Sequence, residues 1–181
     1  MNAKGLAKET AAVSLAYVAA FGLTFKVLMP VQEVWFAELS SRASLLFLPH
    51  GVRVLSAWLL GWRSAIALAP GVLLAFLMVA GFGAFSPSRL VAMLVAVIIP
   101  AATFQALKYM KWDLFPQSGQ TPCWPCIMAA GVVISVLSSL LTNYAFGSAS
   151  EDYVAYLIGD IFGLFFLMLI LMFIFRALRA R

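Results

Sequence analysis

The chain has 181 residues, of which 64% are hydrophobic and only 10% charged, with a mean hydropathy of +1.01 and a formal net charge of +5. A soluble domain of this size cannot bury so much apolar surface, so the composition excludes a soluble fold and predicts an all-α membrane bundle in contact with lipid. Because the basic residues lie at the ends of apolar runs, where they orient a chain in a bilayer, the charge does not indicate a nucleic-acid partner.

Six transmembrane helices are predicted within a single transmembrane domain over residues 1–181. A helix needs about 20 apolar residues to cross the hydrocarbon core. Runs of this kind, separated by proline, glycine and serine clusters, occupy approximately residues 10–30, 44–61, 65–85, 90–107, 126–147 and 154–175. The first run is longer than a signal peptide, so we interpret it as a span. Residues 31–43 are too short and too acidic to cross, and they are predicted to be interfacial or re-entrant.

The distribution of basic residues predicts the orientation of these spans. Six spans place both termini on one side of the membrane. That side holds eight basic residues, and the other holds only Arg42 and Arg89. Basic residues accumulate on the cytoplasmic side of bacterial inner membranes, so both termini are expected to be cytoplasmic. The eight residues are Lys4, Lys8, Arg63, Lys108, Lys111, Arg176, Arg179 and Arg181.

The first span carries two features of interest. Ala12, Ala16 and Ala20 form a repeated A-x-x-x-A pattern, whose small side chains allow another helix to approach closely. This face serves either internal packing or the docking of a protein partner. Lys26 lies near the outer end of the span, where it either snorkels to the interface or contributes to a pocket.

The second span is interrupted by polar residues and helix breakers. His50 and Arg53 are three residues apart and therefore share a helix face. Pro49 removes a backbone donor and Gly51 removes side-chain bulk, so both loosen the helix where the polar residues lie.

Two polar residues of the last spans fall at a similar depth. Asn143 lies near the outer end of the fifth span, and Asp160 lies in the outer third of the sixth. Gly159 and Gly163 beside Asp160 permit close approach of another helix. Because an isolated charge in hydrocarbon costs about 3 kcal/mol, Arg53 is predicted to pair with Asp160.

Two interpretations of this polar level are open. The Arg53–Asp160 pair locks two helices together, or it forms the floor of an outward-facing pocket lined also by Lys26, His50 and Asn143. In the second case Lys26, Arg53 and a protonated His50 outnumber Asp160. Such an excess of positive charge favours a small anionic or carboxylate-bearing ligand.

The only two cysteines, Cys123 and Cys126, have C-x-x-C spacing. On the predicted cytoplasmic side a stable disulfide is not expected, and two ligands do not close a zinc site. A loop without chemistry, a thiol redox role at a helix N-terminus, and a metal shared with another chain remain as alternatives. No cofactor or metal is predicted, and no nucleophile–base motif indicates an enzyme.

Several short motifs occur in the order found in a known family. They are Leu48-Pro-His-Gly-Val52, Leu60-Gly-Trp-Arg63, Pro70-Gly71 and Ile158-Gly-Asp-Ile-Phe-Gly163. In this order the chain resembles the membrane-associated sensor domain of the MASE type. The resemblance implies a sensor of small ligands and marks Pro49, Gly51, Arg63, Gly159, Asp160 and Gly163 as pattern positions. Family members commonly have eight spans and precede kinase or cyclase modules; here six spans end at Arg181, so a signal would pass through a partner.

In size and layout the chain is also similar to the substrate-binding subunits of energy-coupling-factor transporters. Those six-helix proteins dock a coupling subunit through A-x-x-x-A in the first helix, a pattern that Ala12, Ala16 and Ala20 match. The leading expectation is therefore a sensor-type, ligand-binding protein of a bacterial inner membrane. The alternatives are a transporter subunit and a non-catalytic accessory subunit of a larger membrane complex.

Overall fold

The computed structural model describes residues 3–35, 44–116, 122–146 and 151–179, and within these ranges the chain is helical and contains no strand. Five helical stretches in this part of the chain are long and apolar enough to cross a membrane. The predicted all-α membrane bundle of about six helices is thereby confirmed. Its elements are α1 (Ala3–Leu23), the π-helical turn η1 (Thr24–Leu28), α2 (Met29–Trp35), α3 (Leu48–Leu60), α4 (Arg63–Ala80), the 3₁₀ turn η3 (Gly81–Phe85), α5 (Pro87–Tyr109), α6 (Trp124–Phe146) and α7 (Glu151–Arg179).

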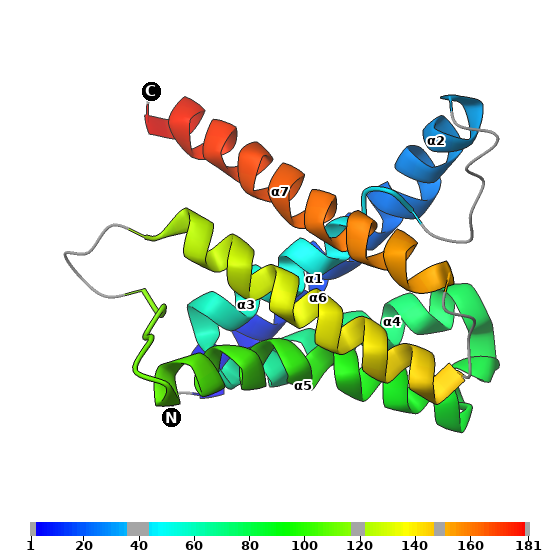
Figure 1. Cartoon of the computed structure of the whole chain (residues 1–181), viewed down its shortest axis with the longest axis horizontal. Helices are drawn as coiled ribbons and strands as arrows, with labels where there is room; N and C mark the ends of the chain where they lie inside the picture. The colour runs from blue at the N-terminus through cyan, green and yellow to red at the C-terminus, as the bar shows by residue number, and fades with distance from the viewer. Residues whose placement is uncertain (1–2, 36–43, 117–121, 147–150, 180–181) are drawn as a thin grey trace.

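The helices run alternately in opposite directions along the long axis of the bundle (Figure 1). The start of α1 and the end of α7 lie at the same end, on the left of Figure 1, together with the α3–α4 connection and the end of α5. We call this the terminal end of the bundle. Arg63 and Lys108 belong to it, and there Arg63 Nη2 pairs with Glu9 Oε2 at 2.8 Å.

The first helix continues beyond Pro30, where the sequence predicts its end. A single helical stretch runs through α1, η1 and α2 and includes residues 31–35, which the sequence assigns to an interfacial segment. In η1 the backbone hydrogen bonds span five residues instead of four, as in the bond from the Met29 N–H to the Thr24 carbonyl. The wider turn gives a proline ring room that a regular α-helix lacks, so the helix continues. Residues 36–43 lie outside the described residues.

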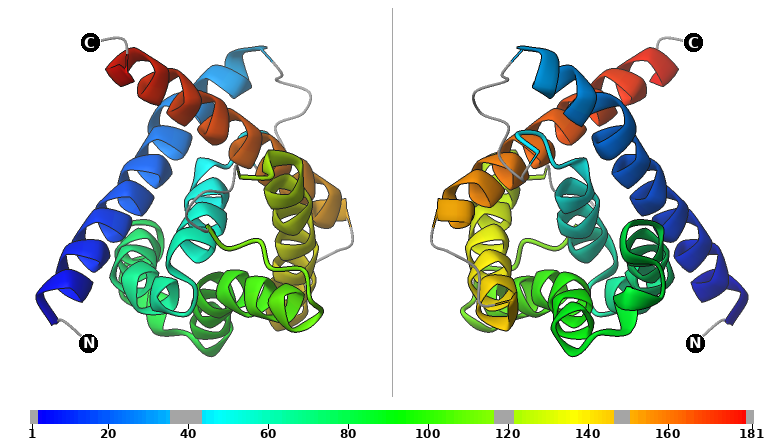
Figure 2. Two further views of the ribbon diagram at one scale, coloured as in Figure 1. Left: turned by 90° about the vertical axis from the view of Figure 1, so that its left-hand side faces the viewer. Right: turned by 90° about the vertical axis from the view of Figure 1, so that its right-hand side faces the viewer.

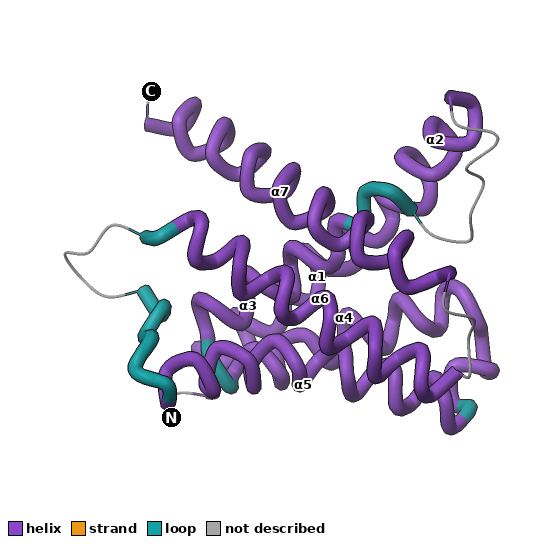
Figure 3. The backbone as a smooth tube through the Cα atoms, viewed as in Figure 1, coloured by secondary structure: helices purple, strands orange, loops and turns teal. Residues whose placement is uncertain are grey.

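The second predicted span, 44–61, is only partly helical. Its helix, α3, has 13 residues and a length of about 20 Å, whereas the hydrocarbon core is about 30 Å thick. The non-helical segment 44–47, which precedes α3, is coloured teal in Figure 3. The end-on views of Figure 2 place α3, in cyan, at the centre of the other helices. All residues from Leu48 to Trp58 are buried, so the polar face of α3 is shielded from lipid.

The backbone of segment 44–47 is bonded by other parts of the chain. Thr24 Oγ1 accepts the Leu48 N–H at 3.3 Å, and Gln32 Oε1 accepts the Leu45 N–H at 2.8 Å. The Phe47 N–H donates to the Gly159 carbonyl of α7 at 2.9 Å. Non-helical backbone is tolerated at membrane depth only where protein groups satisfy it, as these three bonds do. The second crossing is therefore a short helix preceded by an anchored non-helical segment.

The glycines beside Asp160 make room for this segment. A Cβ at Gly159 would overlap the Ser44 carbonyl, and a Cβ at Gly163 would overlap the Phe47 carbonyl. Gly51 of α3 faces the same helix, where an added Cβ would lie 2.8 Å from Leu167 Cδ2. Gly51, Gly159 and Gly163, which the sequence assigns to helix packing, thus all lie where α7 meets α3 and segment 44–47.

The close contact of α1 involves Ser14. Pro70 interrupts the hydrogen-bond ladder of α4, and Ser14 Oγ enters the gap by accepting the Gly71 N–H at 3.1 Å and donating to the Ala67 carbonyl at 2.8 Å. A Cβ at Gly71 would lie 2.8 Å from Ser14 Cα, so only glycine allows this approach. In the A-x-x-x-A pattern, Ala20 is buried, whereas Ala12 and Ala16 are exposed.

Candidate ligand-binding site

The polar residues of α3, α6 and α7 form one buried cluster. Arg53 Nη2 lies 3.8 Å from Asp160 Oδ1, and both side chains are 9% exposed. Asp160 Oδ2 accepts a hydrogen bond from Ser135 Oγ at 2.7 Å and lies 3.2 Å from His50 Nδ1. Two groups thus contact Asp160 Oδ2, and Asp160 Oδ1 faces the more distant Arg53 guanidinium.

His50 lies behind Asp160. Its Nε2 donates to the Gly131 carbonyl at 3.2 Å, so this nitrogen carries a proton. In the neutral ring, Nδ1 is an acceptor for Arg53 Nη2 at 3.5 Å; in the protonated ring, Nδ1 donates to Asp160 instead. His50 is fully buried, and it orients the pair without facing the cavity described next.

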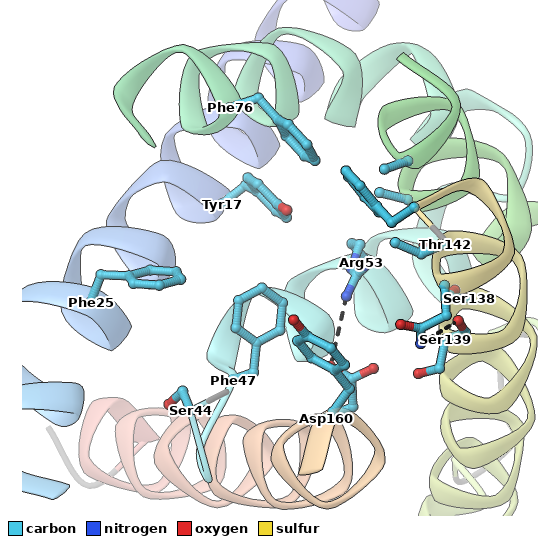
Figure 4. Close-up of a pocket in the computed structure, with 15 residues that line it drawn as sticks. Tyr17, Phe25, Ser44, Phe47, Arg53, Phe76, Ser138, Ser139, Thr142 and Asp160 are labelled. Carbon is cyan, nitrogen blue, oxygen red and sulfur yellow. Dashed lines mark hydrogen bonds and ion pairs between the residues drawn. The ribbon is translucent and has the colours of Figure 1, made fainter. Parts of the chain in front are cut away.

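A cavity of about 440 Å³ lies above this cluster. Its residues come from the halves of α1, α4, α6 and α7 that are distant from the terminal end, from η1, segment 44–47 and α3, and from the start of α5. Arg53 and Asp160 lie where α3 and α7 approach the cavity, with Arg53 between two different walls (Figure 4). A volume of this size is typical of sites for small organic ligands.

One wall of the cavity is aromatic and the other carries hydroxyl groups (Figure 4). The Arg53 guanidinium lies 5.7 Å from the centre of the Phe47 ring, within the range of a cation–π contact. Opposite, α6 presents hydroxyl and amide side chains. The aromatic residues of the lining are Tyr17, Phe25, Phe47, Phe76, Phe146 and Tyr156, and the polar residues of α6 are Ser138, Ser139, Thr142 and Asn143.

Two polar atoms of the lining have no hydrogen-bond partner among the described residues. They are Arg53 Nε and Ser138 Oγ, and both belong to buried side chains. An unpaired buried donor costs about 1–3 kcal/mol, so a bound molecule that accepts hydrogen bonds from these atoms would recover that energy. Arg53 retains further capacity because its guanidinium has five donors and its contact with Asp160 is long.

The structure brings together four of the five predicted pocket residues. Arg53, Asp160 and His50 form the cluster, and Asn143 lines the cavity while its Nδ2 donates to the Ser139 carbonyl of its own helix at 2.8 Å. Lys26 is exposed in η1 and does not line the cavity. The π-helical turn adds a residue to the turn, which changes the face on which Lys26 emerges. Among the described lining residues Arg53 is then the cation and Asp160 the anion, so the predicted excess of positive charge is not found.

Sequence reasoning missed the hydroxyl wall and the aromatic wall. Ser138, Ser139 and Thr142 precede Asn143 in an otherwise apolar span, and their clustering at one end of that span was a usable signal. The aromatic residues gave no such signal, because phenylalanine is frequent throughout the chain.

Cys123 and Cys126 are joined by a disulfide, which corrects the expectation that none would form. That expectation rested only on the predicted cytoplasmic location of the two cysteines, where thiols are normally kept reduced. The geometry of the first turn of α6 brings the two Cα atoms to 5.2 Å, within the range that a disulfide bridges. The pair lies at the terminal end of the bundle, at the end of α6 opposite the cavity-lining residues.

The fold and the site define a polytopic helical membrane protein with a buried ion pair beside a cavity. Comparison with protein families, curated proteins and solved structures finds no match to this chain.

Proposed function

We propose that this protein is a sensor-type, ligand-binding protein of a bacterial inner membrane, which holds a small amphipathic carboxylate in the cavity between α1, α6 and α7. The carboxylate accepts hydrogen bonds from Arg53 and Ser138, and the apolar body of the ligand lies against the aromatic wall. The observation that carries the proposal is the pair of unpartnered donors, Arg53 Nε and Ser138 Oγ, at one cavity.

The distribution of polar groups favours a ligand with one charged end. Among the described residues that line the cavity, Arg53 is the cation, and its long contact with Asp160 leaves it available for a second anion. Apart from the Asp160 carboxylate and the small side chains of Ala92 and Ala96, the remainder of the lining is aromatic or carries neutral hydroxyl and amide groups. Small-molecule sites commonly combine an apolar lining with a few placed polar groups of this kind.

The orientation of the site supports access of the ligand from outside the cell. The cavity-lining residues of α6 and α7 belong to the half of the bundle away from the terminal end, whereas Arg63 and Lys108 lie at the terminal end. Because basic residues mark the cytoplasmic side, the cavity faces the periplasm and both termini are cytoplasmic. A reporter that functions only in the cytoplasm should be active when it is fused to Arg181. Activity of a reporter that functions only in the periplasm would overturn this orientation.

Benzoate is a suitable first probe because it combines one carboxylate with an aromatic body. It should raise the melting temperature of the detergent-solubilised protein, and its neutral isostere benzamide should not. Ser138→Ala should weaken benzoate binding by about tenfold or more, because a hydrogen bond to a charged group contributes about 1.5–3 kcal/mol. The matched control is Ser64→Ala, since Ser64 is buried but does not line the cavity.

The proposal fails if benzoate and benzamide act equally, or if Ser138→Ala and Ser64→Ala retain the same affinity for benzoate. Mass spectrometry of small molecules that co-purify with the wild type provides an independent test. A carboxylate retained by the wild type should be depleted from the Ser138→Ala variant. Recovery of only neutral lipids from both proteins would favour the accessory-subunit alternative.

A second candidate function, a transporter subunit, is favoured by one observation. Ala12 and Ala16 are exposed on α1, the helix that also forms a groove with α4 lined by Ser14 and Pro70. Small exposed side chains allow close approach of a partner helix. Ala16→Leu should then abolish co-purification of a membrane partner while benzoate binding persists, and recovery of no partner from native membranes would remove this candidate.

A further inference from the structure

The cysteine pair occupies a defined position at the start of α6. Cys123 directly precedes the first residue of the helix, and its carbonyl accepts the Ile127 N–H at 3.1 Å, which places Cys123 at the N-cap. Cys126 lies in the first turn, and the two sulfur atoms are bonded. The unpaired N–H groups of a first helical turn stabilise a thiolate, so this position favours reactive cysteine.

The disulfide is accessible. Cys123 is exposed, Cys126 is partly exposed, and the intervening Trp124 is 50% exposed. An exposed disulfide is open to attack by a thiolate, whereas a structural disulfide is normally buried. The two cysteines are only three positions apart in the sequence, so the bridge closes a very short loop and constrains the unfolded chain very little. Accessibility and loop size therefore both argue against a purely structural role.

We propose that Cys123–Cys126 is a thiol–disulfide exchange site, and that its partner is a protein dithiol of the thioredoxin class. The partner thiolate attacks Cys123 Sγ, which is the more exposed sulfur, and the electron pair of the broken bond leaves on Cys126 Sγ. The second thiol of the partner then attacks the partner's sulfur atom in the mixed disulfide, and Cys123 is released as a thiolate. Two electrons and two protons pass to this chain, and the partner becomes a disulfide.

The surrounding residues suit this exchange. Pro122 directly precedes Cys123, and Pro125 directly precedes Cys126. Neither proline has an N–H, so neither leaves a backbone donor to be satisfied when a partner chain approaches the cysteines. Trp124 lies with its ring centre 5.9 Å from that of Trp58, and Trp58 Nε1 donates to the Leu114 carbonyl at 2.5 Å. Because Trp124 lies between the cysteines, its fluorescence should change when the disulfide opens.

The exchange is tested with the full-length protein in detergent. Reduced thioredoxin, maintained by its reductase and NADPH, should reduce the wild-type disulfide under native conditions. Maleimide–polyethylene glycol should then add two labels per chain, and tryptophan fluorescence should change at the same rate. A disulfide that resists both thioredoxin and millimolar dithiothreitol until the protein is unfolded would overturn the proposal.

Single-cysteine variants identify the attacked sulfur. A thioredoxin that lacks its resolving cysteine is first loaded with thionitrobenzoate on the remaining cysteine. Cys126→Ser retains the exposed thiol and should form the mixed disulfide about tenfold faster than Cys123→Ser, because the thiolate at the N-cap is both stabilised and accessible. Equal rates, or no covalent complex with either variant, would contradict the assignment. The test does not use the cavity, so its outcome is independent of the proposed ligand.

Discussion

Replacing Asp160 by asparagine should destabilise the protein strongly, because it leaves a cation unpaired in the bundle interior. The Arg53 side chain is 9% exposed, and its guanidinium faces the Asp160 carboxylate at 3.8 Å. An asparagine oxygen would still accept the hydrogen bond that Ser135 now donates at 2.7 Å, so the loss comes chiefly from the charge. We expect Asp160→Asn to lower the free energy of unfolding by about 3 kcal/mol, the lower part of the range for breaking a buried pair.

A double-mutant cycle separates this charge effect from local packing. Arg53→Met removes the unpaired cation while keeping a long side chain, so the double variant should recover about 2 kcal/mol of the loss. The matched control is Glu9→Gln, which breaks the pair with Arg63 at the terminal end. That pair is shorter, 2.8 Å, but its side chains are 29% and 44% exposed, so its loss should cost less than about 1 kcal/mol.

Reversible unfolding in mixed micelles, titrated with sodium dodecyl sulfate and followed by tryptophan fluorescence, measures the four free energies of the cycle and that of the Glu9→Gln control. The explanation is wrong if the effects of Asp160→Asn and Arg53→Met add to within about 0.5 kcal/mol, because additive effects exclude coupling between the two groups. It is equally wrong if Asp160→Asn costs no more than Glu9→Gln. Either result would mean that water or lipid headgroups solvate Arg53 in the folded protein.

Three further predictions concern the stability of two helix contacts and of the disulfide. Gly163→Ala should cost about 1–3 kcal/mol because its Cβ overlaps segment 44–47, whereas Gly22→Ala, with no atom within 4 Å, should be neutral or stabilising in the same titration. Ser14→Ala should cost about 1–2 kcal/mol because it removes the hydroxyl that bridges the interrupted ladder of α4, and a loss below about 0.3 kcal/mol would show that the ladder closes by itself. Replacing both cysteines by serine should leave the yield unchanged and the melting temperature within about 4 °C, and a larger fall would indicate a structural disulfide.

The sequence contains enough information for the bundle and for part of the site. Apolar runs of sufficient length identify α4, α5, α6 and α7 to within a few residues, because no other environment accommodates them. The juxtaposition of Arg53 with Asp160 follows from matched depth, since charges at one level of a bundle gain by facing each other.

The remaining features depend on contacts that no local pattern encodes. Pro30 looks like a helix end, and only the π-helical turn before it shows that the helix continues. Whether residues 44–47 are helical depends on partners supplied by Thr24, Gln32 and Gly159, which lie elsewhere in the chain. Lys26 was misplaced for the same reason, because its direction depends on the turn that surrounds it.

The anchored segment 44–47 also has a consequence for biosynthesis. Its Phe47 N–H is satisfied by the Gly159 carbonyl of α7, which leaves the ribosome after all the other helices. Until α7 arrives, that peptide group has no protein partner in the bilayer and must remain near water or within the insertion machinery. The central helix of the finished bundle is thus among the last to reach its final position, although it is the second to be made. Chains truncated after α6 should therefore be retained by membrane quality control, with residues 44–47 accessible to water-soluble thiol reagents when a cysteine is placed there.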